Sequence, residues 1–120
     1  MRLEMMKALL LKAWCAETAK GTWTPECPSL NQCAVTALVV QDFFGGQLLR
    51  CKTDSGDSHY WNRLPDGREV DLTEEQFSFI ADKPLKEEFV VRERGYVLAF
   101  PETVARYLLL KKRVFDQLNS

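Results

Sequence analysis

Residues 31–40 read NQCAVTALVV, an apolar run that begins with a polar pair and a cysteine. Only Thr36 interrupts the apolar residues, and a helix that is apolar on nearly every side is buried by its neighbours. The chain reaches Gly45-Gly46 soon afterwards, and glycine is the usual residue just past a helix C-terminus. We therefore expect a buried central helix that carries Cys33 in its first turn.

Two further helices are predicted nearer the ends of the chain. Residues 3–18 carry apolar side chains at spacings of three and four, the pattern of a helix with one buried face. Pro101 suits the first position of a helix, and the residues after it show an apolar face to about residue 118. At the start of the central helix, Ser29 and Gln32 match a capping box, in which each side chain would bond to a free backbone N–H group.

A β-hairpin is the clearest strand signal. Residues 59–64 and 68–72 flank the sequence Leu-Pro-Asp-Gly at positions 64–67. Proline at the second position and glycine at the fourth are typical of a type I turn followed by a G1 bulge. Residues 48–52 and 88–92 are predicted as further strands. These strands predict an antiparallel sheet of about four strands.

The turn also sets the register of the hairpin. The turn pairs Leu64 with Arg68. Counting back along both strands from this pair places His59, Trp61 and Asp71 on one face of the hairpin, with His59 and Asp71 as diagonal neighbours. Side chains in that relation are close enough to touch. A shift of one residue would place them on opposite faces, so any chemistry that needs both depends on this register.

Composition predicts one domain over residues 1–120. Apolar residues make up 46% of the chain, enough for an ordinary core. The fold class we expect is α+β, with the cysteine helix packed on the antiparallel sheet and the terminal helices flanking it. The net charge of −1 creates no field that would attract nucleic acid or an anionic membrane. No apolar run approaches the roughly 20 residues of a membrane span, so we expect a cytoplasmic protein.

The chain has four cysteines and one histidine. A hydrophobic core of this size is stable without disulfide bonds, and nothing in the sequence indicates export. We therefore expect the four cysteines to be reduced thiols. Two disulfides remain the alternative, because the number of cysteines is even. The absence of a Cys-x-x-Cys pair argues against zinc. No metal or other cofactor is expected.

A thiol, an imidazole and a carboxylate occur in the order Cys33, His59, Asp71. A helix N-terminus and a nearby imidazole both activate a thiol as a nucleophile. This set predicts a thiol hydrolase or acyltransferase that acts on an amide, isopeptide or thioester, in a peptide or small acyl substrate. Cys33 would attack the carbonyl, His59 would transfer the proton, and Asp71 would orient the imidazole.

Three neighbouring residues are candidates for substrate contact. The Gln32 side chain, with the Cys33 backbone N–H group, would stabilise the oxyanion. Trp61 and Asn62 would bind substrate beside His59. A tryptophan at the Trp61 position more often packs the hairpin than binds substrate, and Asn62 could replace Asp71 as the partner of the imidazole.

Two other functions are compatible with the same residues. A binding or adaptor module of the same fold would leave Cys33 unreactive. A thiol redox sensor would need Cys27 or Cys51 within disulfide reach of Cys33, which means Cα atoms less than about 7 Å apart. The sequence indicates neither the substrate nor the oligomeric state.

Order and spacing also carry a resemblance to a known family. Residues 32–46, 58–67 and 69–73 resemble the YunG family of small bacterial proteins, with likeness from about residue 23 to residue 77. In that family a glycine commonly precedes the Gln-Cys pair, and here that position is Asn31. The pattern in turn resembles the papain-like and transglutaminase-like superfamily. In that superfamily a cysteine begins a central helix, a histidine lies on the following sheet, and an Asp or Asn on the next strand orients it. The resemblance implies those roles for the same three residues.

Overall fold

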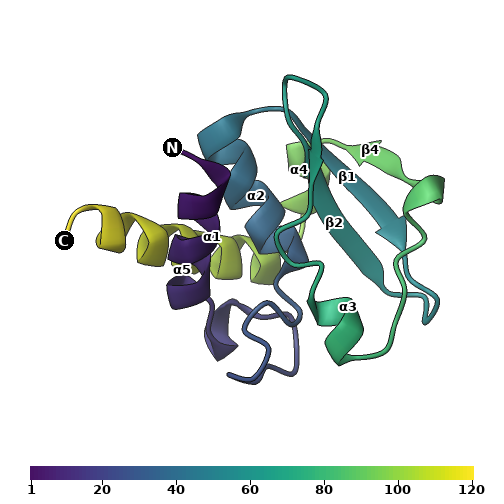
Figure 1. Ribbon diagram of the computed structural model, residues 1–120, viewed down its shortest axis with the longest axis horizontal. Helices are drawn as coiled ribbons and strands as arrows, with labels where there is room; N and C mark the ends of the chain where they lie inside the picture. Colours follow the sequence, from purple (N-terminus) through teal and green to yellow (C-terminus); the bar gives the residue numbers. More distant parts are fainter.

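The structure is a computed structural model that describes all 120 residues. Five α-helices and a four-stranded antiparallel sheet form a mixed α+β fold (Figure 1), in which both termini lie away from the sheet. The helices are α1 (Leu3–Ala13), α2 (Cys33–Phe44), α3 (Gln76–Phe79), α4 (Arg94–Val97) and α5 (Pro101–Leu118). The strands are β1 (Gln47–Lys52), β2 (Ser58–Arg63), β3 (Glu69–Val70) and β4 (Val90–Arg92), and 3₁₀ turns cover Ala16–Thr18 and Lys86–Glu88.

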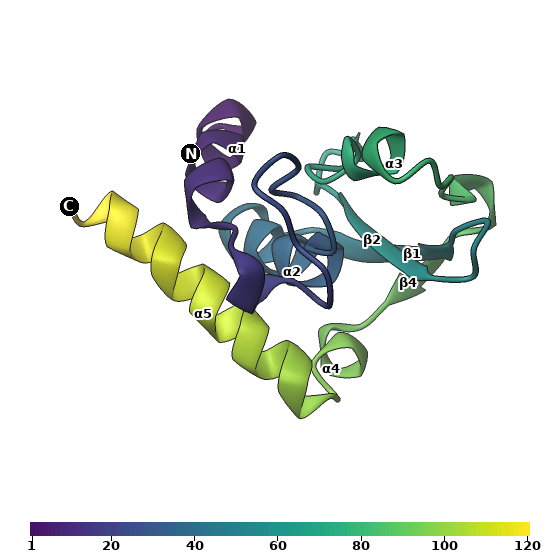
Figure 2. The ribbon, with the colours of Figure 1, turned by 90° about the horizontal axis from the view of Figure 1, so that it is seen from below.

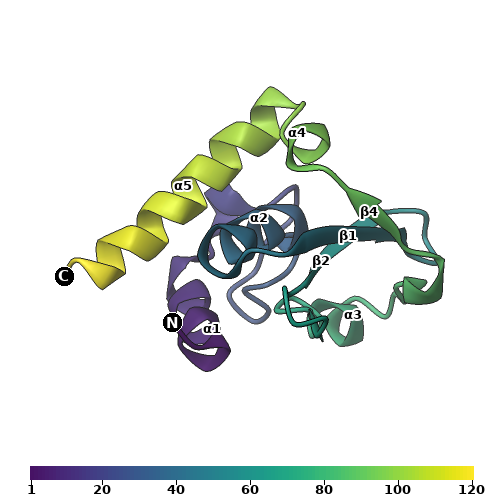
Figure 3. The same cartoon turned by 90° about the horizontal axis from the view of Figure 1, so that it is seen from above.

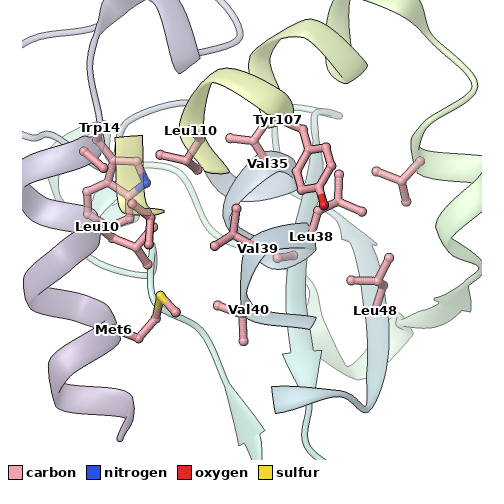
Figure 4. Close-up of a cluster of buried hydrophobic side chains, with 14 of the residues drawn as sticks. Met6, Leu10, Trp14, Val35, Leu38, Val39, Val40, Leu48, Tyr107 and Leu110 are labelled. Carbon is pink, nitrogen blue, oxygen red and sulfur yellow. The ribbon is translucent and has the colours of Figure 1, made fainter. Parts of the chain in front are cut away.

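Helix α2 lies at the centre of the fold, between α1 and α5 on one side and the sheet on the other (Figure 3). Its residues from Val35 to Val40 are all buried, as the apolar run predicts. The polar Thr36 is accommodated because its hydroxyl accepts a hydrogen bond from the indole of Trp14 at 2.8 Å. Figure 4 shows the resulting core, whose labelled members are Met6, Leu10, Trp14, Val35, Leu38, Val39, Val40, Leu48, Tyr107 and Leu110.

The first helix is shorter than predicted. Helix α1 ends at Ala13, and Trp14 leaves the helical conformation with ψ 136°. A 3₁₀ turn over Ala16–Thr18 follows, closed by hydrogen bonds between Thr18 and Cys15. The prediction of one helix over residues 3–18 is therefore wrong at its C-terminal end. The break directs the Trp14 indole onto α2, a tertiary contact that apolar spacing along α1 does not reveal.

The sheet has the strand order β3-β2-β1-β4, and every neighbouring pair is antiparallel. The hairpin register predicted from the turn is confirmed: Asn62 pairs with Val70 and Arg63 with Glu69. Within the turn, Leu64 donates a hydrogen bond to the carbonyl of Arg68 at 2.7 Å. The returning strand is shorter than expected, since β3 ends at Val70. Strand β4 likewise begins only at Val90, because residues 86–88 form a 3₁₀ turn.

A second polar group of α2 ties this helix to the C-terminal part of the chain. Asp42 forms an ion pair with Arg94 of α4 at 2.9 Å and accepts a hydrogen bond from Tyr107 of α5. Figure 2 shows α4 at the end of α5 that is nearer the sheet. Helices α2, α4 and α5 are thereby fixed relative to one another. None of the helices is both long and apolar enough to cross a bilayer.

Candidate active site

Cys33 is the first residue of α2, and its thiol is half-buried. The backbone N–H groups of the first turn of a helix have no partner within the helix, and the helix dipole adds positive potential there. Asn31, two residues earlier, has φ +61°, a left-handed conformation that glycine adopts freely and asparagine tolerates best among the other residues. The chain therefore enters α2 through a residue whose backbone geometry is the one that glycine favours.

The capping box predicted at the start of α2 does not form. The residue at the N-cap position is Gln32, and no side chain caps the helix. Ser29 is wholly buried and instead accepts a hydrogen bond from the Gln32 backbone through its carbonyl at 3.1 Å. The chain enters the helix through a tight turn, and the first N–H groups of α2 stay free for another acceptor.

His59 and Asp71 form the central contact of the site. His59 Nε2 lies 2.6 Å from Asp71 Oδ2, and the two side chains are only 1% and 4% exposed. His59 is the second residue of β2, and Asp71 directly follows β3. The diagonal relation predicted from the hairpin register therefore brings the two groups together, and Asn62 does not take the place of Asp71.

Aromatic rings enclose the imidazole. Trp61 stacks on it with ring centroids 5.6 Å apart, and Phe77 meets it edge-on at 4.6 Å. Trp61 is buried and its indole donates to Glu69 at 2.9 Å. Trp61 therefore packs against the imidazole and does not line the cleft, which is the packing role that the sequence also allowed, and its contact with substrate stays a prediction.

Asn62 lies on the same strand as His59. It is buried, and its side-chain amide donates to the carbonyl of Ala37 in α2 at 2.9 Å. This bond joins β2 to the central helix, so Asn62 fixes the strand that carries His59 against the helix that carries Cys33. The structure thus gives Asn62 a positioning contact, and its contact with substrate stays a prediction.

The Cys33 thiol lies beside the start of β2. Its sulfur is 3.8 Å from the carbonyl oxygen of Ser58, the residue before His59. Burial lowers the pKa of His59, but the Asp71 carboxylate and the nearby Cys33 sulfur outweigh it and raise that pKa to about 9. The second ring nitrogen, Nδ1, is buried and has no hydrogen-bond partner. Because Asp71 occupies Nε2, Nδ1 is the nitrogen left to exchange a proton with the thiol.

Asp71 is held by more groups than the sequence indicated. Lys86 lies 2.8 Å from Oδ2, and the backbone and hydroxyl of Thr73 donate to Oδ1 at 3.2 and 3.3 Å. Burial raises the pKa of Asp71, but hydrogen bonds and positive charge from His59 and Lys86 lower it below its ordinary value. Asp71 therefore stays ionised beside the imidazole. Nothing in the local pattern around Lys86 signals this contact, because the residue arrives from a distant turn.

Gln76 links the two halves of the site. Its Oε1 accepts a hydrogen bond from the backbone of Asn31 at 3.1 Å, and its Nε2 donates to the Thr73 hydroxyl at 3.0 Å. The Thr73 hydroxyl in turn donates to Asp71. Gln76 begins α3, so this short helix is tied to the loop before Cys33 by a tertiary contact that the local sequence does not reveal.

The expected oxyanion contact of Gln32 is not made in this structure. The side chain is fully buried, and its Nε2 donates to the carbonyl of Cys15 at 2.9 Å. It therefore holds the loop after α1 against the start of α2. The free backbone N–H groups at the start of α2 are the better placed donors, because Cys33 and Ala34 border the cleft described next.

A cleft of about 370 Å³ opens in front of Cys33. It is built from the start of α2, strands β1 and β2, helix α4, the start of α5, and the loop before α2. Of the three candidate catalytic residues only Cys33 lines it, and His59 and Asp71 lie beneath the surface. The half-buried thiol is thus the one of these groups that a bound molecule can reach directly.

All four cysteines are free thiols. His, Cys, Asp and Glu side chains form no group of three or more with the geometry to hold a metal ion. The groups that remain for chemistry at the cleft are the Cys33 thiol, the imidazole behind it and the N–H groups of α2.

The free energy of unfolding should fall as the pH rises from 6.5 to 9, because the fold retains a proton on His59. The ordinary pKa is 6.5 and the pKa in the fold is about 9. The stabilisation is complete below pH 6.5, where both states carry the proton, and is lost as the pH passes the folded pKa. The slope is at most about 1.4 kcal/mol per pH unit.

Urea unfolding of the wild type and of His59→Gln across that pH range measures this effect. The variant lacks the titrating group, so the difference in unfolding free energy between the two proteins should shrink with increasing pH. A difference that stays constant between pH 6.5 and 9 would contradict the raised pKa of His59.

The family model described as YunG protein matches residues 2–119. A curated relative, the uncharacterized protein YunG of Bacillus subtilis strain 168, is 41% identical over 75 residues. This alignment covers 62% of the chain and spans 63% of the relative's own length. No solved structure matches the chain with significance, so the resemblance to papain-like and transglutaminase-like proteins stays a prediction.

Proposed function

The chain belongs to the YunG family, as its motifs predicted, and we propose that it is a cysteine-dependent hydrolase or acyltransferase. Its substrate would be an amide, isopeptide or thioester. The observation that carries the proposal is the buried His59–Asp71 pair beside a thiol that begins a helix and borders a cleft. A buried carboxylate that orients an imidazole, next to a nucleophile at a helix N-terminus, is the arrangement that nucleophilic catalysis requires.

In the first step the Cys33 sulfur attacks the carbonyl carbon of the substrate. A protonated imidazole favours the thiolate form of a neighbouring cysteine, and the pKa of about 9 keeps His59 protonated at neutral pH. As the tetrahedral intermediate collapses, His59 gives its proton to the leaving nitrogen or sulfur. The acyl group remains on Cys33 as a thioester.

In the second step water or an acceptor amine or thiol attacks that thioester. The neutral imidazole takes a proton from the attacking group, and the Cys33 thiolate leaves. Water gives hydrolysis and another acceptor gives acyl transfer. Throughout, Asp71 holds the ring through Nε2 and balances its positive charge.

The negative oxygen of each intermediate needs donors at the start of α2. The backbone N–H groups of Cys33 and Ala34 have no partner within the helix and border the cleft, where they would act as the oxyanion site. The order of a helix-start cysteine, a strand histidine and a carboxylate on the next strand is the order expected of papain-like and transglutaminase-like thiol enzymes. We extend the proposal to that class of site.

A reactive-thiol assay tests the proposal. With an uncharged acyloxymethyl ketone at pH 7, Cys33 should be labelled at least about ten times faster than Cys15, the other half-buried thiol. Mass spectrometry of the labelled peptides gives the rate for each residue. Cys33→Ala should lose the fast phase, whereas Cys15→Ala should keep it and serves as the matched control.

The same assay distinguishes the alternatives. Equal labelling of Cys33 and Cys15, with no turnover of amide, isopeptide or thioester model compounds, would overturn the proposal and favour a binding module. Rapid formation of a disulfide between Cys33 and Cys27 or Cys51 in dilute peroxide, again without turnover, would instead favour a redox sensor.

A further inference from the structure

Three cationic side chains line the cleft in front of Cys33: Lys20, Arg50 and Arg106. None of them forms a salt bridge with a carboxylate of the protein. The one acidic residue of the lining is the exposed Asp57, whose carboxylate makes no ion pair. The cleft therefore has an excess of positive charge although the whole chain carries a net charge of −1.

Arg106 provides an independent sign of a missing partner. Its Nε is buried and has no hydrogen-bond acceptor, and its Nη2 donates only to Thr103 at 3.2 Å. A guanidinium that lines a cleft and has so few acceptors within the protein can still bind a carboxylate or phosphate through its terminal N–H groups. A smaller adjoining hollow shares Lys20 and Arg106 and also includes Glu102, which forms no salt bridge with them.

The rest of the lining is aromatic and apolar. Tyr96 and Phe100 are 50% and 59% exposed, and Tyr60 from β2 lies on the same lining. Large aromatic side chains left this exposed beside a cleft commonly form part of a binding surface. A volume of about 370 Å³ is at the small end of ligand pockets, so it admits one side chain or a small acyl group.

We propose that this cleft binds the part of the acyl donor next to the reacting carbonyl, and that this part carries an anionic group, a carboxylate or a phosphate. Arg50 and Arg106 would hold the anion, and the aromatic side chains would cover the apolar atoms that connect it to the carbonyl. The inference rests on the proposed function, because it places the anion relative to the carbonyl that Cys33 attacks.

The test uses peptide vinyl sulfones that differ in one side chain next to the reactive group: Glu, Gln, Lys or phosphoserine. The labelling rate of Cys33 should be about tenfold higher with Glu or phosphoserine than with Gln, and lowest with Lys. The faster of the Glu and phosphoserine probes identifies the anion. Raising the salt concentration to 0.5 M should reduce the preference.

Arg106→Gln and Arg50→Gln should each reduce that preference to about twofold or less, while neutral iodoacetamide still labels Cys33 fastest. Lys112→Gln is the matched control. It removes the same charge from α5, but Lys112 is exposed, pairs with Asp116 and lies outside the cleft lining. This variant should retain the full preference.

The two proposals fail in different ways. Equal labelling by the Glu, Gln and phosphoserine probes, with Cys33 still the fastest thiol toward iodoacetamide, would overturn the anion site alone. Unreactive Cys33 toward every probe would overturn the proposed function. In that case, the anion site is tested by NMR line broadening of inorganic phosphate and of succinate, each mixed with the wild type or with Arg106→Gln. Line broadening that the wild type causes and Arg106→Gln does not would support the anion site. The absence of line broadening with both proteins would overturn the anion site.

Discussion

His59→Gln should lower the rate at which Cys33 turns over an amide or thioester substrate by a factor of about 10² to 10⁴, the usual contribution of a positioned acid–base group. Glutamine is polar and of similar size but cannot carry a proton between the thiol and the leaving group. The measurement is kcat with the best substrate from the amide, isopeptide and thioester panel. Labelling of Cys33 by the acyloxymethyl ketone should slow in parallel, because the thiolate loses the neighbouring positive charge.

Stability must be measured alongside this rate. His59 is 1% exposed and packed between Trp61 and Phe77, so its replacement will also lower the free energy of unfolding. Leu110→Ala is the control, because it removes buried core packing from α5 at a position that neither lines the cleft nor contacts His59. It should destabilise the fold but retain turnover per folded molecule. A His59→Gln protein that turns over substrate within about threefold of the wild type would show that His59 is not the proton carrier.

The pairing of His59 with Asp71 could be predicted because it depends on local chemistry. A Pro-Asp-Gly turn fixes the hairpin register, and strand alternation then fixes which side chains share a face. The helix start at Cys33 was equally accessible, since residues 33–40 are apolar apart from Thr36 and a glycine pair follows Phe44. Both features lie within short segments of the chain, where turn and periodicity rules apply.

The surroundings of that pair could not be predicted, because they come from segments distant in sequence. Trp61 shares a face with His59, as expected, but the layer that covers this face is formed by Phe77 and Lys86, which follow the hairpin. The alternation of side chains along a strand predicts which face of the sheet each side chain occupies. It does not predict whether that face is exposed to solvent or covered by another segment of the chain. The same limit explains Gln32, whose amide bonds to Cys15 across a loop that no periodicity describes.

The cleft was missed for a related reason. Its cationic members come from the loop after α1, from β1 and from α5, and each looks like an ordinary solvated charge in its own segment. Lys111, Lys112 and Arg113 form a basic run in the sequence of α5, but they lie outside the cleft. These single charges lie close together only in the folded protein, so the sequence of each segment alone does not predict the cationic cleft.

Gly46→Ala should cause the largest loss of stability among conservative single substitutions, roughly 3 kcal/mol or more. Gly46 has φ +83°, and a Cβ atom there would lie 2.1 Å from the carbonyl oxygen of Arg63 and 3.0 Å from Leu64 Cα. Both atoms belong to the backbone at the end of β2, where Arg63 pairs with Gln47, so neither can move without breaking the sheet.

Gly56→Ala separates the clash from the strain of the backbone. Gly56 has φ +93° but nothing within 4 Å of the added Cβ, so this variant should lose only about 1 to 2 kcal/mol. Urea unfolding gives both values. Gly46 also joins α2 to β1, which pairs with the strand that carries His59, so Gly46→Ala should slow Cys33 labelling even where the protein is still folded. Equal losses of stability in the two variants would mean that the close approach of Gly46 to β2 does not constrain the fold, and that the position of α2 against the sheet is set by the core alone.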